Sequence, residues 1–314
     1  MAALYVEIAP FTVRLYPCAP MPFLGEIFST LAALAWAFAI VFYRKGRVDD
    51  EPVGFNLVKC FVAAPLFLLT LVVTGTPFVP DCAPSDWVRL AVSGLIGISL
   101  ADTLFFIALA KMGAGLMAIV DAAYAPSVIL LSAAFLGERM GWVALAGAAL
   151  VIAAMLVGSR GRPVEGHTRK DVVAGIVIGA LAVIAMGVAI VIAKPALDRT
   201  PILWATAVRV SAATIGLLPL ALVPRWRAEM GRVVGMGRRW AWAFPGILLG
   251  AYGSMILWVA GMKFTLASVA SVLNQLSTIF IALFAALFLH EPMGPRRITA
   301  LVLAVLGALL VVVR

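Results

Sequence analysis

The sequence predicts an all-α polytopic membrane protein with ten transmembrane helices, arranged as two inverted five-helix repeats. Of its 314 residues, 64% are hydrophobic and only 12% are charged, and the mean hydropathy is +1.09. Soluble domains are about half apolar and about a quarter charged. The apolar residues also form segments of membrane-spanning length, and polar residues inside those segments recur in the second half of the chain.

Ten segments meet the requirement of a spanning helix for about 20 predominantly apolar residues. A tight turn at Lys111–Gly113 separates the third segment from the fourth, and most other connections are short. In chain order the segments cover residues 23–43, 54–74, 87–110, 113–136, 140–158, 171–193, 202–223, 240–262, 265–289 and 296–313.

A Gly- and Arg-rich linker at residues 159–170 separates a first repeat (22–158) from a second repeat (171–314). Residues 1–21 form an N-terminal tail. This tail lacks the basic start and long apolar core of a signal peptide. It is either an extension upstream of a start at Met21 or a short surface segment.

The repeats are visible in the placement of polar residues. A shift of 153 residues aligns Glu138 with Glu291 and Asp121 with Asn274, and a shift of 150 brings Lys59 onto Arg209. Because five is an odd number of crossings, the two halves must enter the membrane from opposite sides. Inverted repeats of this kind are common in secondary transporters.

Basic residues concentrate in the connections after the odd-numbered segments. The positive-inside rule places these connections in the cytoplasm and both termini outside, in a multi-pass protein of the bacterial inner membrane. The net charge of +9 is then explained by residues facing anionic lipid, and no nucleic-acid partner is predicted. The basic residues are Arg44, Lys45, Arg47, Lys111, Arg160, Arg162, Arg169, Lys170, Arg225, Arg227, Arg232, Arg238, Arg239, Arg296 and Arg297.

Enzyme motifs are absent from the sequence. There is no G-x-S-x-G, no H-E-x-x-H and no phosphate-binding glycine loop, and the two histidines are isolated. We therefore predict no enzymatic activity, no cofactor and no metal site. Cys18 and Cys82 fall on the same predicted side of the membrane, which makes a disulfide between them a secondary hypothesis.

Residues 22–314 resemble the EamA type of the drug/metabolite transporter superfamily. The resemblance is carried by the ten segments in two halves, by GEIFSTLAALAWAFAIVFYRKG and GISLADTLFFIALAKMGAG, and by a fourth segment ending in Gly137-Glu138 with its echo His290-Glu291. It implies transport of small metabolites such as amino acids, nucleotide sugars or drugs, with a site between the repeats. Many relatives have cytoplasmic termini, whereas the charge distribution here predicts the reverse.

Three charged residues lie at one predicted depth near the cytoplasmic side. Lys59, Asp102 and Asp121 each fall roughly 8–12 Å inside the membrane, counted along their helices. Charged groups at that depth face a partner or a wet cavity. Two neighbouring carboxylates favour protonation of one of them near neutral pH. The cluster therefore predicts a substrate-gating or proton-carrying site, with a structural ion pair as the alternative.

The second repeat predicts a matching layer near the opposite face, where Arg209 falls in the seventh segment and Asn274 and Gln275 in the ninth. Glu26 starts from the same face and is the predicted partner of Arg209. Ser271 and Thr278 share the stripe of Asn274 and are predicted to line the cavity. The alternative for this stripe is interhelical hydrogen bonding that holds the bundle together.

Further candidates come from the faces shared with the acids. Tyr124 follows Asp121 and is assigned to substrate binding, while Ser99 precedes Asp102 and is assigned to the cavity wall. Pro126 removes a backbone donor and is the predicted hinge. Packing alone is the alternative for Pro126 and for the three aromatic residues assigned to the cavity wall, Trp36, Tyr252 and Trp258.

Two features are assigned to structure rather than transport. Glu138 and Glu291 end their helices and are expected to meet Arg139 or Arg297 as structural locks. The fifth and tenth segments carry almost no polar residues and suit a scaffold or the face of a homodimer.

The principal hypothesis is a secondary active transporter of a small polar or amphipathic metabolite, working by alternating access around a central cavity. A more specific form of this hypothesis couples transport to protons through Asp102 and Asp121. One alternative is a flippase for a lipid or lipid-linked sugar, which needs a long apolar groove beside the polar cluster. Another is a membrane scaffold without transport, in which the charges are fully paired and no central cavity exists.

Overall fold

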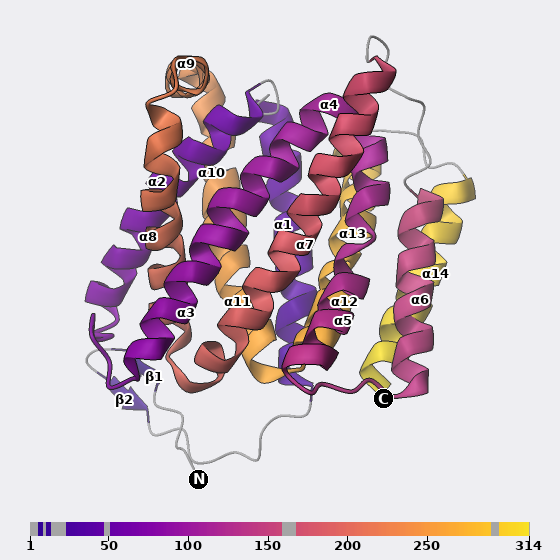
Figure 1. Cartoon of the computed structure of the whole chain (residues 1–314), viewed down its shortest axis with the longest axis horizontal. Coiled ribbons are helices and arrows are strands. Elements are labelled where there is room, and N and C mark those ends of the chain that lie inside the picture. Colours follow the sequence, from indigo (N-terminus) through magenta and orange to yellow (C-terminus); the bar gives the residue numbers. More distant parts are fainter. Residues whose placement is uncertain are drawn as a thin grey trace.

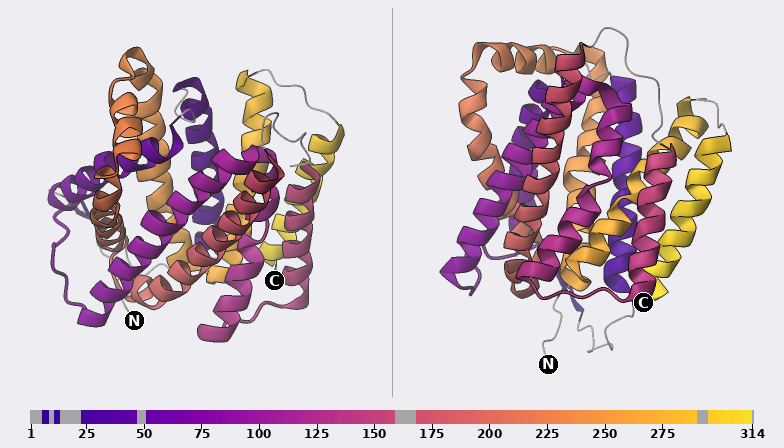
Figure 2. Two further views of the ribbon diagram at one scale, coloured as in Figure 1. Left: turned by 45° about the horizontal axis from the view of Figure 1, so that its top comes forward. Right: turned by 45° about the vertical axis from the view of Figure 1, so that its right-hand side comes forward.

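A computed structural model describes residues 6–8, 11–13, 23–46, 51–158, 168–289 and 295–313. These residues form a bundle of helices, preceded by a short antiparallel hairpin of β1 (Val6–Ile8) and β2 (Phe11–Val13) (Figure 1). The start of α1 and the end of α14 lie at the same end of the bundle (Figures 1 and 2).

The helices of the first half match the predicted order, but several are longer or divided. They are α1 (Leu24–Gly46), α2 (Pro52–Val73), α3 (Pro84–Gly94), the π-helix η2 (Leu95–Ala101), α4 (Asp102–Asp121), α5 (Tyr124–Phe135) and α6 (Trp142–Gly158).

The second half repeats this pattern and adds a surface helix. Its elements are α7 (Arg169–Arg199), α8 (Ile202–Ala221), α9 (Pro224–Val234), the 3-10 turn η3 (Gly237–Arg239), α10 (Trp240–Ile247), the π-helix η4 (Leu248–Ser254), α11 (Met255–Phe264), α12 (Ala267–Asn274), α13 (Leu276–Leu289) and α14 (Pro295–Val313).

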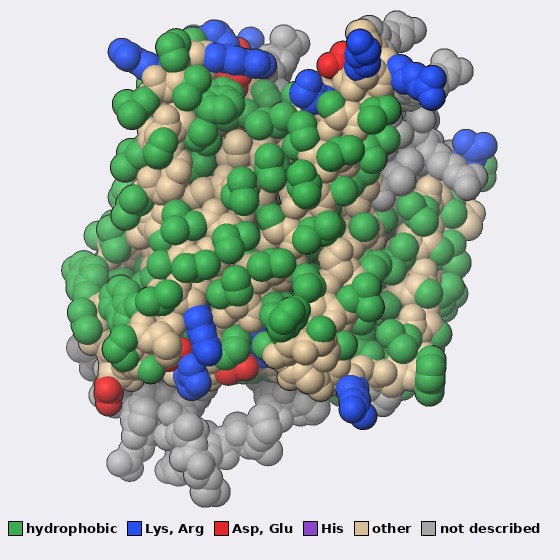
Figure 3. Space-filling view, in the orientation of Figure 1, with side chains coloured by type: hydrophobic (Ala, Val, Ile, Leu, Met, Phe, Trp, Pro, Cys, Tyr) green, Lys and Arg blue, Asp and Glu red, His purple; other side chains and the backbone are tan. Residues whose placement is uncertain are grey.

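The helices have the length and composition expected of a membrane protein. Among the described residues, six continuous helical stretches are long and apolar enough to cross a bilayer, and shorter apolar helices accompany them. Hydrophobic side chains form a band across the molecule, and most of the basic side chains visible on this face gather at the end where α9 lies (Figure 3). The shorter helices are Tyr124–Phe135, Trp142–Ala154, Ala267–Ile281 and Ile298–Val313.

The same backbone irregularity, a π-helix, is found in both halves of the chain. The π-helices η2 and η4 each span seven residues, and the start of η4 follows the start of η2 by 153 residues, the shift that also aligns Asp121 with Asn274. Each contains a glycine where a neighbouring helix comes close. A Cβ on Gly97 would lie 2.9 Å from the Cβ of Ala189, and a Cβ on Gly250 would lie 2.8 Å from the Cβ of Ala39.

The tight turn predicted at Lys111–Gly113 falls inside α4, where the backbone stays helical while the chain changes direction. A Cβ on Gly179 of α7 would lie 3.4 Å from the Cβ of Ala108 and 3.2 Å from Cγ1 of Val120. Twelve residues of straight helix would hold those two side chains about 18 Å apart. The chain therefore folds back between them and then descends toward α5 (Figure 1).

The predicted fourth and ninth helices are not continuous, which corrects the sequence prediction. The fourth is interrupted by a turn at Ala122–Ala123, between α4 and α5, and the ninth by a turn at Gln275, between α12 and α13. Composition did not mark the break at Gln275, because the residues on both sides of it are predominantly apolar, whereas Pro126 had marked the neighbourhood of the break at Ala122–Ala123.

Two peripheral features frame the bundle. Helices α6 and α14 pack along each other at one edge (Figure 2), where a Cβ on Gly147 would lie 2.6 Å from the carbonyl oxygen of Gly307. Helix α9 lies across one end of the bundle (Figure 1), and its Glu229 accepts a hydrogen bond of 3.1 Å from the backbone N–H of Gly54.

Candidate functional site

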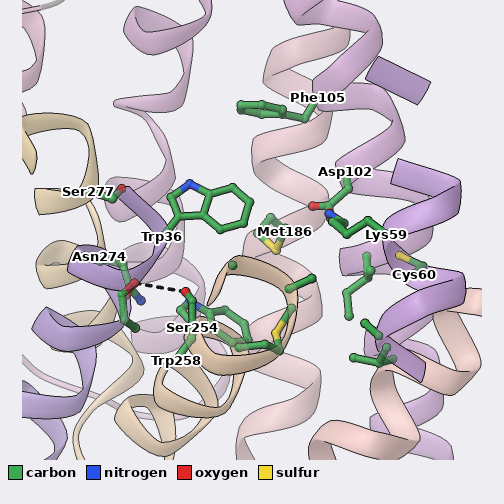
Figure 4. A pocket seen from close by; sticks show the side chains of 18 of the residues that line it. Trp36, Lys59, Cys60, Asp102, Phe105, Met186, Ser254, Trp258, Asn274 and Ser277 are labelled. Carbon is green, nitrogen blue, oxygen red and sulfur yellow. Dashed lines mark hydrogen bonds and ion pairs between the residues drawn. The ribbon is translucent and has the colours of Figure 1, made fainter. Parts of the chain in front are cut away.

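A cavity of about 270 Å³ lies in the interior of the bundle, bounded by helices from both halves of the chain. Figure 4 shows the side chains that surround it. Nine of the predicted site residues line it: Trp36, Lys59, Asp102, Asp121, Tyr124, Arg209, Trp258, Asn274 and Gln275.

Lys59 and Asp102 form an ion pair in the cavity wall. Lys59 projects from α2, and Asp102 is the first residue after the π-helix η2. The Nζ–Oδ2 distance is 3.3 Å, and the side chains are 7% and 23% exposed. The two side chains point toward each other in Figure 4. Each charge thereby offsets part of the cost of burying the other.

Arg209 is a buried cation for which the described residues supply no anionic hydrogen-bond partner. It projects from α8 and is 1% exposed, and its guanidinium lies 4.9 Å above the ring of Trp258. No described residue accepts a hydrogen bond from its Nε or Nη1. The predicted partner Glu26 instead accepts a 2.8 Å hydrogen bond from the hydroxyl of Thr265. The Glu26–Arg209 pair was therefore a wrong prediction, because depth along a helix does not specify which way a side chain faces.

Asp121 ends α4 at the helix break and borders the cavity. In the part of the chain that the structure describes, no hydrogen bond or ion pair engages its carboxylate. Pro126 follows in the first turn of α5, and its ring nitrogen cannot donate to the carbonyl of Ala122, where the helix is interrupted. Pro126 therefore lies next to the break, and its role as a hinge stays a prediction.

Gln275 joins the two broken helices. Its Nε2 donates a hydrogen bond of 2.8 Å to the backbone carbonyl oxygen of Asp121. The neighbouring Asn274 also lines the cavity, and its Nδ2 has no partner among the described residues. The interruptions in the two halves thus meet at the cavity wall.

Four residues predicted to line the cavity lie outside its lining, which corrects the prediction. Ser99 donates 2.7 Å to the carbonyl of Ala213, and Ser271 donates 2.7 Å to that of Ser268. The hydroxyl of Tyr252 is 2.6 Å from that of Thr70. Thr278 follows the break, and its N–H bonds to the carbonyl of Gln275. Ser99 and Tyr252 therefore join neighbouring helices, whereas Ser271 bonds within its own helix α12 and does not show the interhelical hydrogen bond of the alternative interpretation.

Glu138 also has a different partner from the one predicted. Its carboxylate accepts hydrogen bonds of 2.9 Å from the N–H groups of Ala267 and Ser268, and one of 2.6 Å from the hydroxyl of Ser268. It thus caps the N-terminus of α12, where a negative charge is stabilised by the helix dipole. Glu291 and Cys18, half of the disulfide hypothesis, lie outside the described residues.

The sequence analysis missed much of the cavity's remaining wall. Phe105 and Phe106 follow Asp102 by one helical turn, and this spacing could have identified them. Met186 lies on α7 and carried no signal in the sequence. The other missed lining residues with a sulfur atom or a hydroxyl group are Cys60, Ser254, Met255 and Ser277.

Comparison with known proteins identifies related chains. The model of the EamA-like transporter family matches residues 23–160 and 173–313. An uncharacterized transporter of Archaeoglobus fulgidus is 24% identical over 90% of this chain and 96% of its own length. A probable terminal-alkyne amino-acid exporter of Streptantibioticus cattleyicolor is 30% identical over 60% of this chain and 61% of its own length.

A solved crystal structure has the same fold. It aligns with a TM-score of 0.75 at 18% sequence identity, covering 92% of this chain and 96% of that chain.

Proposed function

The chain belongs to the EamA-like transporter family, and we propose that it is a secondary active transporter that carries a small polar or amphipathic metabolite by alternating access. The observation that carries this proposal is the interior cavity, with Lys59, Asp102, Asp121 and Arg209 in its wall. Charges inside an apolar bundle are costly and mark substrate or ion pathways.

The proposed architecture is ten crossings in two inverted repeats, residues 22–158 and 171–314. The π-helices η2 and η4 and the breaks at Ala122 and Gln275 support it, because both pairs are related by a shift of 153 residues. In such transporters one repeat rocks against the other around a site at the centre of the membrane. Interrupted helices beside the cavity supply places where that motion can occur.

The proposed orientation puts both termini outside a bacterial inner membrane. It is supported by the basic residues at the opposite end of the bundle, which include Arg44 and Lys45 at the end of α1 and Arg232 on α9. A homodimer through the edge formed by α6 and α14 remains a prediction.

Asp121 is the residue that we assign to proton coupling. Its carboxylate borders the cavity without a counter-charge among the described residues, so protonation there removes an uncompensated buried charge. Asp102 is held by Lys59 at 3.3 Å and is assigned to gating, in which the pair separates as the repeats move.

The incomplete pairing of the cavity charges favours transport over a scaffold, in which each charge would be matched. A lipid flippase is the competing class, and a thermal-shift screen separates the two. Water-soluble metabolites that raise the melting temperature in a concentration-dependent way support the proposal. Efflux of the selected metabolite from proteoliposomes then tests transport directly. Stabilisation by lipids alone, with no efflux of any metabolite, would overturn it.

A further inference from the structure

We propose that the outward face of α9 and the adjoining turn η3 form a binding surface for anionic phospholipids of the bilayer. This inference is independent of the substrate and of the mechanism of transport. Its basis is a group of arginines that the fold holds beside exposed apolar side chains, at the end of the bundle where basic residues gather (Figure 3).

Helix α9 is an addition to the second half of the chain. The corresponding connection of the first half, residues 74–83 between α2 and α3, contains no lysine or arginine. Residues 224–239, between α8 and α10, contain five arginines and one acid. Since the first half joins its two helices without a basic segment, the connection of α8 to α10 does not by itself require α9.

The orientation of α9 places it where lipid headgroups lie. The helix runs across the end of the bundle, roughly at right angles to the long helices (Figure 1). Helices in the plane of the membrane surface contact headgroups with basic residues and the upper acyl chains with apolar ones. Leu222, just before α9, is 81% exposed, and Val234 at its end is 60% exposed. These apolar side chains favour a lipid over a soluble anion as the occupant.

One face of α9 is fixed by the protein. Glu229 and Val233 are its buried residues, and the helix packs against α2. Glu229 accepts a hydrogen bond of 3.1 Å from the backbone N–H of Gly54. Arg232 forms an ion pair with Glu51 at the start of α2, with an Nη2–Oε2 distance of 2.9 Å. These contacts set the rotation of α9 and turn its opposite face outward.

The outward face of α9 presents a cation without a protein partner. Arg227, Gly231 and Val234 share this face at helical spacing, and all three are exposed. A Cβ on Gly231 would meet no atom within 4 Å, so the described residues leave this face open. No described acid forms an ion pair with Arg227 or with Arg238 of η3.

The turn after α9 keeps two further arginines at the same end of the bundle. Nε1 of Trp240 donates a hydrogen bond of 3.1 Å to the carbonyl oxygen of Val234. Because this bond closes the chain between the end of α9 and the start of α10, it holds Arg238 and Arg239 near the last turn of α9. Arginine side chains from both segments can therefore reach one patch of headgroups.

An anionic phospholipid supplies the negative charge that this surface lacks. The five arginines of α9 and η3 are accompanied by two carboxylates among the described residues, those of Glu51 and Glu229. A phosphodiester binds a guanidinium through charge-assisted hydrogen bonds. In phosphatidylcholine an ammonium group offsets the phosphate, whereas phosphatidylglycerol keeps a net negative charge. The predicted ligand is therefore a lipid of the second kind.

The test compares three probes on the full-length protein purified in detergent. Dioleoylphosphatidylglycerol is the anionic lipid, dioleoylphosphatidylcholine has the same chains without net charge, and glycerol 3-phosphate is an anion without chains. Thermal shift and native mass spectrometry measure binding. We expect only phosphatidylglycerol to raise the melting temperature, saturably and less strongly as salt increases. Equal effects of the two lipids, an equal effect of glycerol 3-phosphate, or no effect of any probe would refute the proposal.

Paired variants then locate the binding surface. Arg227→Gln/Arg238→Gln should weaken phosphatidylglycerol binding roughly 25-fold, from about fivefold for each arginine. Arg139→Gln/Arg296→Gln removes two charges from exposed positions outside α9 and should leave binding unchanged. Both double variants should melt like the unmodified protein before lipid is added, which separates lost binding from lost folding. An equal loss of binding in both would show that net charge alone attracts the lipid, against a site on α9. Neither result bears on whether the chain transports a metabolite.

Discussion

Gln275 of the second half donates a hydrogen bond of 2.8 Å from its side-chain Nε2 to the backbone carbonyl of Asp121 in the first half. The acceptor is the last residue of α4, directly before the turn at Ala122, and Gln275 occupies the corresponding turn between α12 and α13. One side chain therefore connects the two helix interruptions. The residues at these interruptions, Ala122 and Gln275, are 153 positions apart in the sequence.

Replacing Gln275 with methionine should destabilise the protein. Gln275 is 3% exposed, and methionine has a similar length but cannot donate to the carbonyl of Asp121. Leaving a buried acceptor unpaired costs about 1–3 kcal/mol. Thermal unfolding in detergent measures the effect, with the exposed substitution Arg227→Gln as the control. An unchanged melting temperature would show that the contact adds nothing to stability.

The Lys59–Asp102 pair should behave as a coupled unit. Lys59→Met alone leaves Asp102 without its cation and should cost about 3 kcal/mol, whereas the double variant Lys59→Met/Asp102→Leu should recover most of that loss. A double-mutant cycle of unfolding free energies measures the coupling. Additive losses in the double variant would contradict it. Transport should remain absent in the double variant, because the gating charges are gone.

Asp121→Asn should uncouple transport from the proton gradient. In proteoliposomes, we expect accumulation driven by a pH gradient to be lost, because asparagine cannot take up and release a proton. Counterflow at saturating substrate should persist, since the rocking of the repeats needs no gradient. Asp198→Asn, which alters an acid paired with Lys194 outside the cavity lining, is the matched control. Driven uptake that is unchanged in Asp121→Asn would remove Asp121 from the coupling mechanism.

Cys82 reports the orientation of the protein in the membrane. It lies between α2 and α3, at the opposite end of the bundle from α9, and is partly exposed. In a Cys18→Ser/Cys60→Ser background, an impermeant maleimide should label Cys82 from outside intact cells. In the Arg227→Cys variant, the same reagent should label position 227 only after the cells are permeabilised. The reverse pattern would put the termini in the cytoplasm.

The same labelling reaction should depend strongly on pH. Partial burial raises the pKa of the Cys82 thiol, and the nearby negative charges of Asp86 and Asp81 raise it further. A higher pKa means less reactive thiolate at a given pH, so labelling should be slow at pH 7 and continue to accelerate above pH 8.5. A rate that levels off below pH 8 would show that these groups do not act on the thiol.

Removing the cap at Glu138 should destabilise the start of α12. Glu138→Ala removes three hydrogen bonds to Ala267 and Ser268, at a cost of about 1–2 kcal/mol. Glu51→Ala breaks the surface pair with Arg232 and should cost less than about 1 kcal/mol. Thermal unfolding compares the two variants. Equal losses would indicate that Glu138 acts as an ordinary surface carboxylate.

The membrane class could be predicted from composition, the family from the resemblance of residues 22–314 to its members, and the charged cavity residues from position along each helix. Counting residues from the helix ends placed Lys59 and Asp102 at one depth, and the two side chains do form a pair. The same counting selected Arg209 and Asp121. These inferences succeed because burying a charge in an apolar segment is costly wherever the segment packs.

The partners of the buried polar groups required the packed bundle. Ser99 and Tyr252 bond to neighbouring helices outside the cavity lining, Glu26 bonds to Thr265 instead of Arg209, and Gln275 reaches Asp121 through an interruption that composition does not mark. Hydrophobic periodicity is faint in helices that are apolar on every side, so the sequence contains little information about helix rotation. Close contacts at glycines and the π-helical turns determine that rotation, and with it which charges share the cavity.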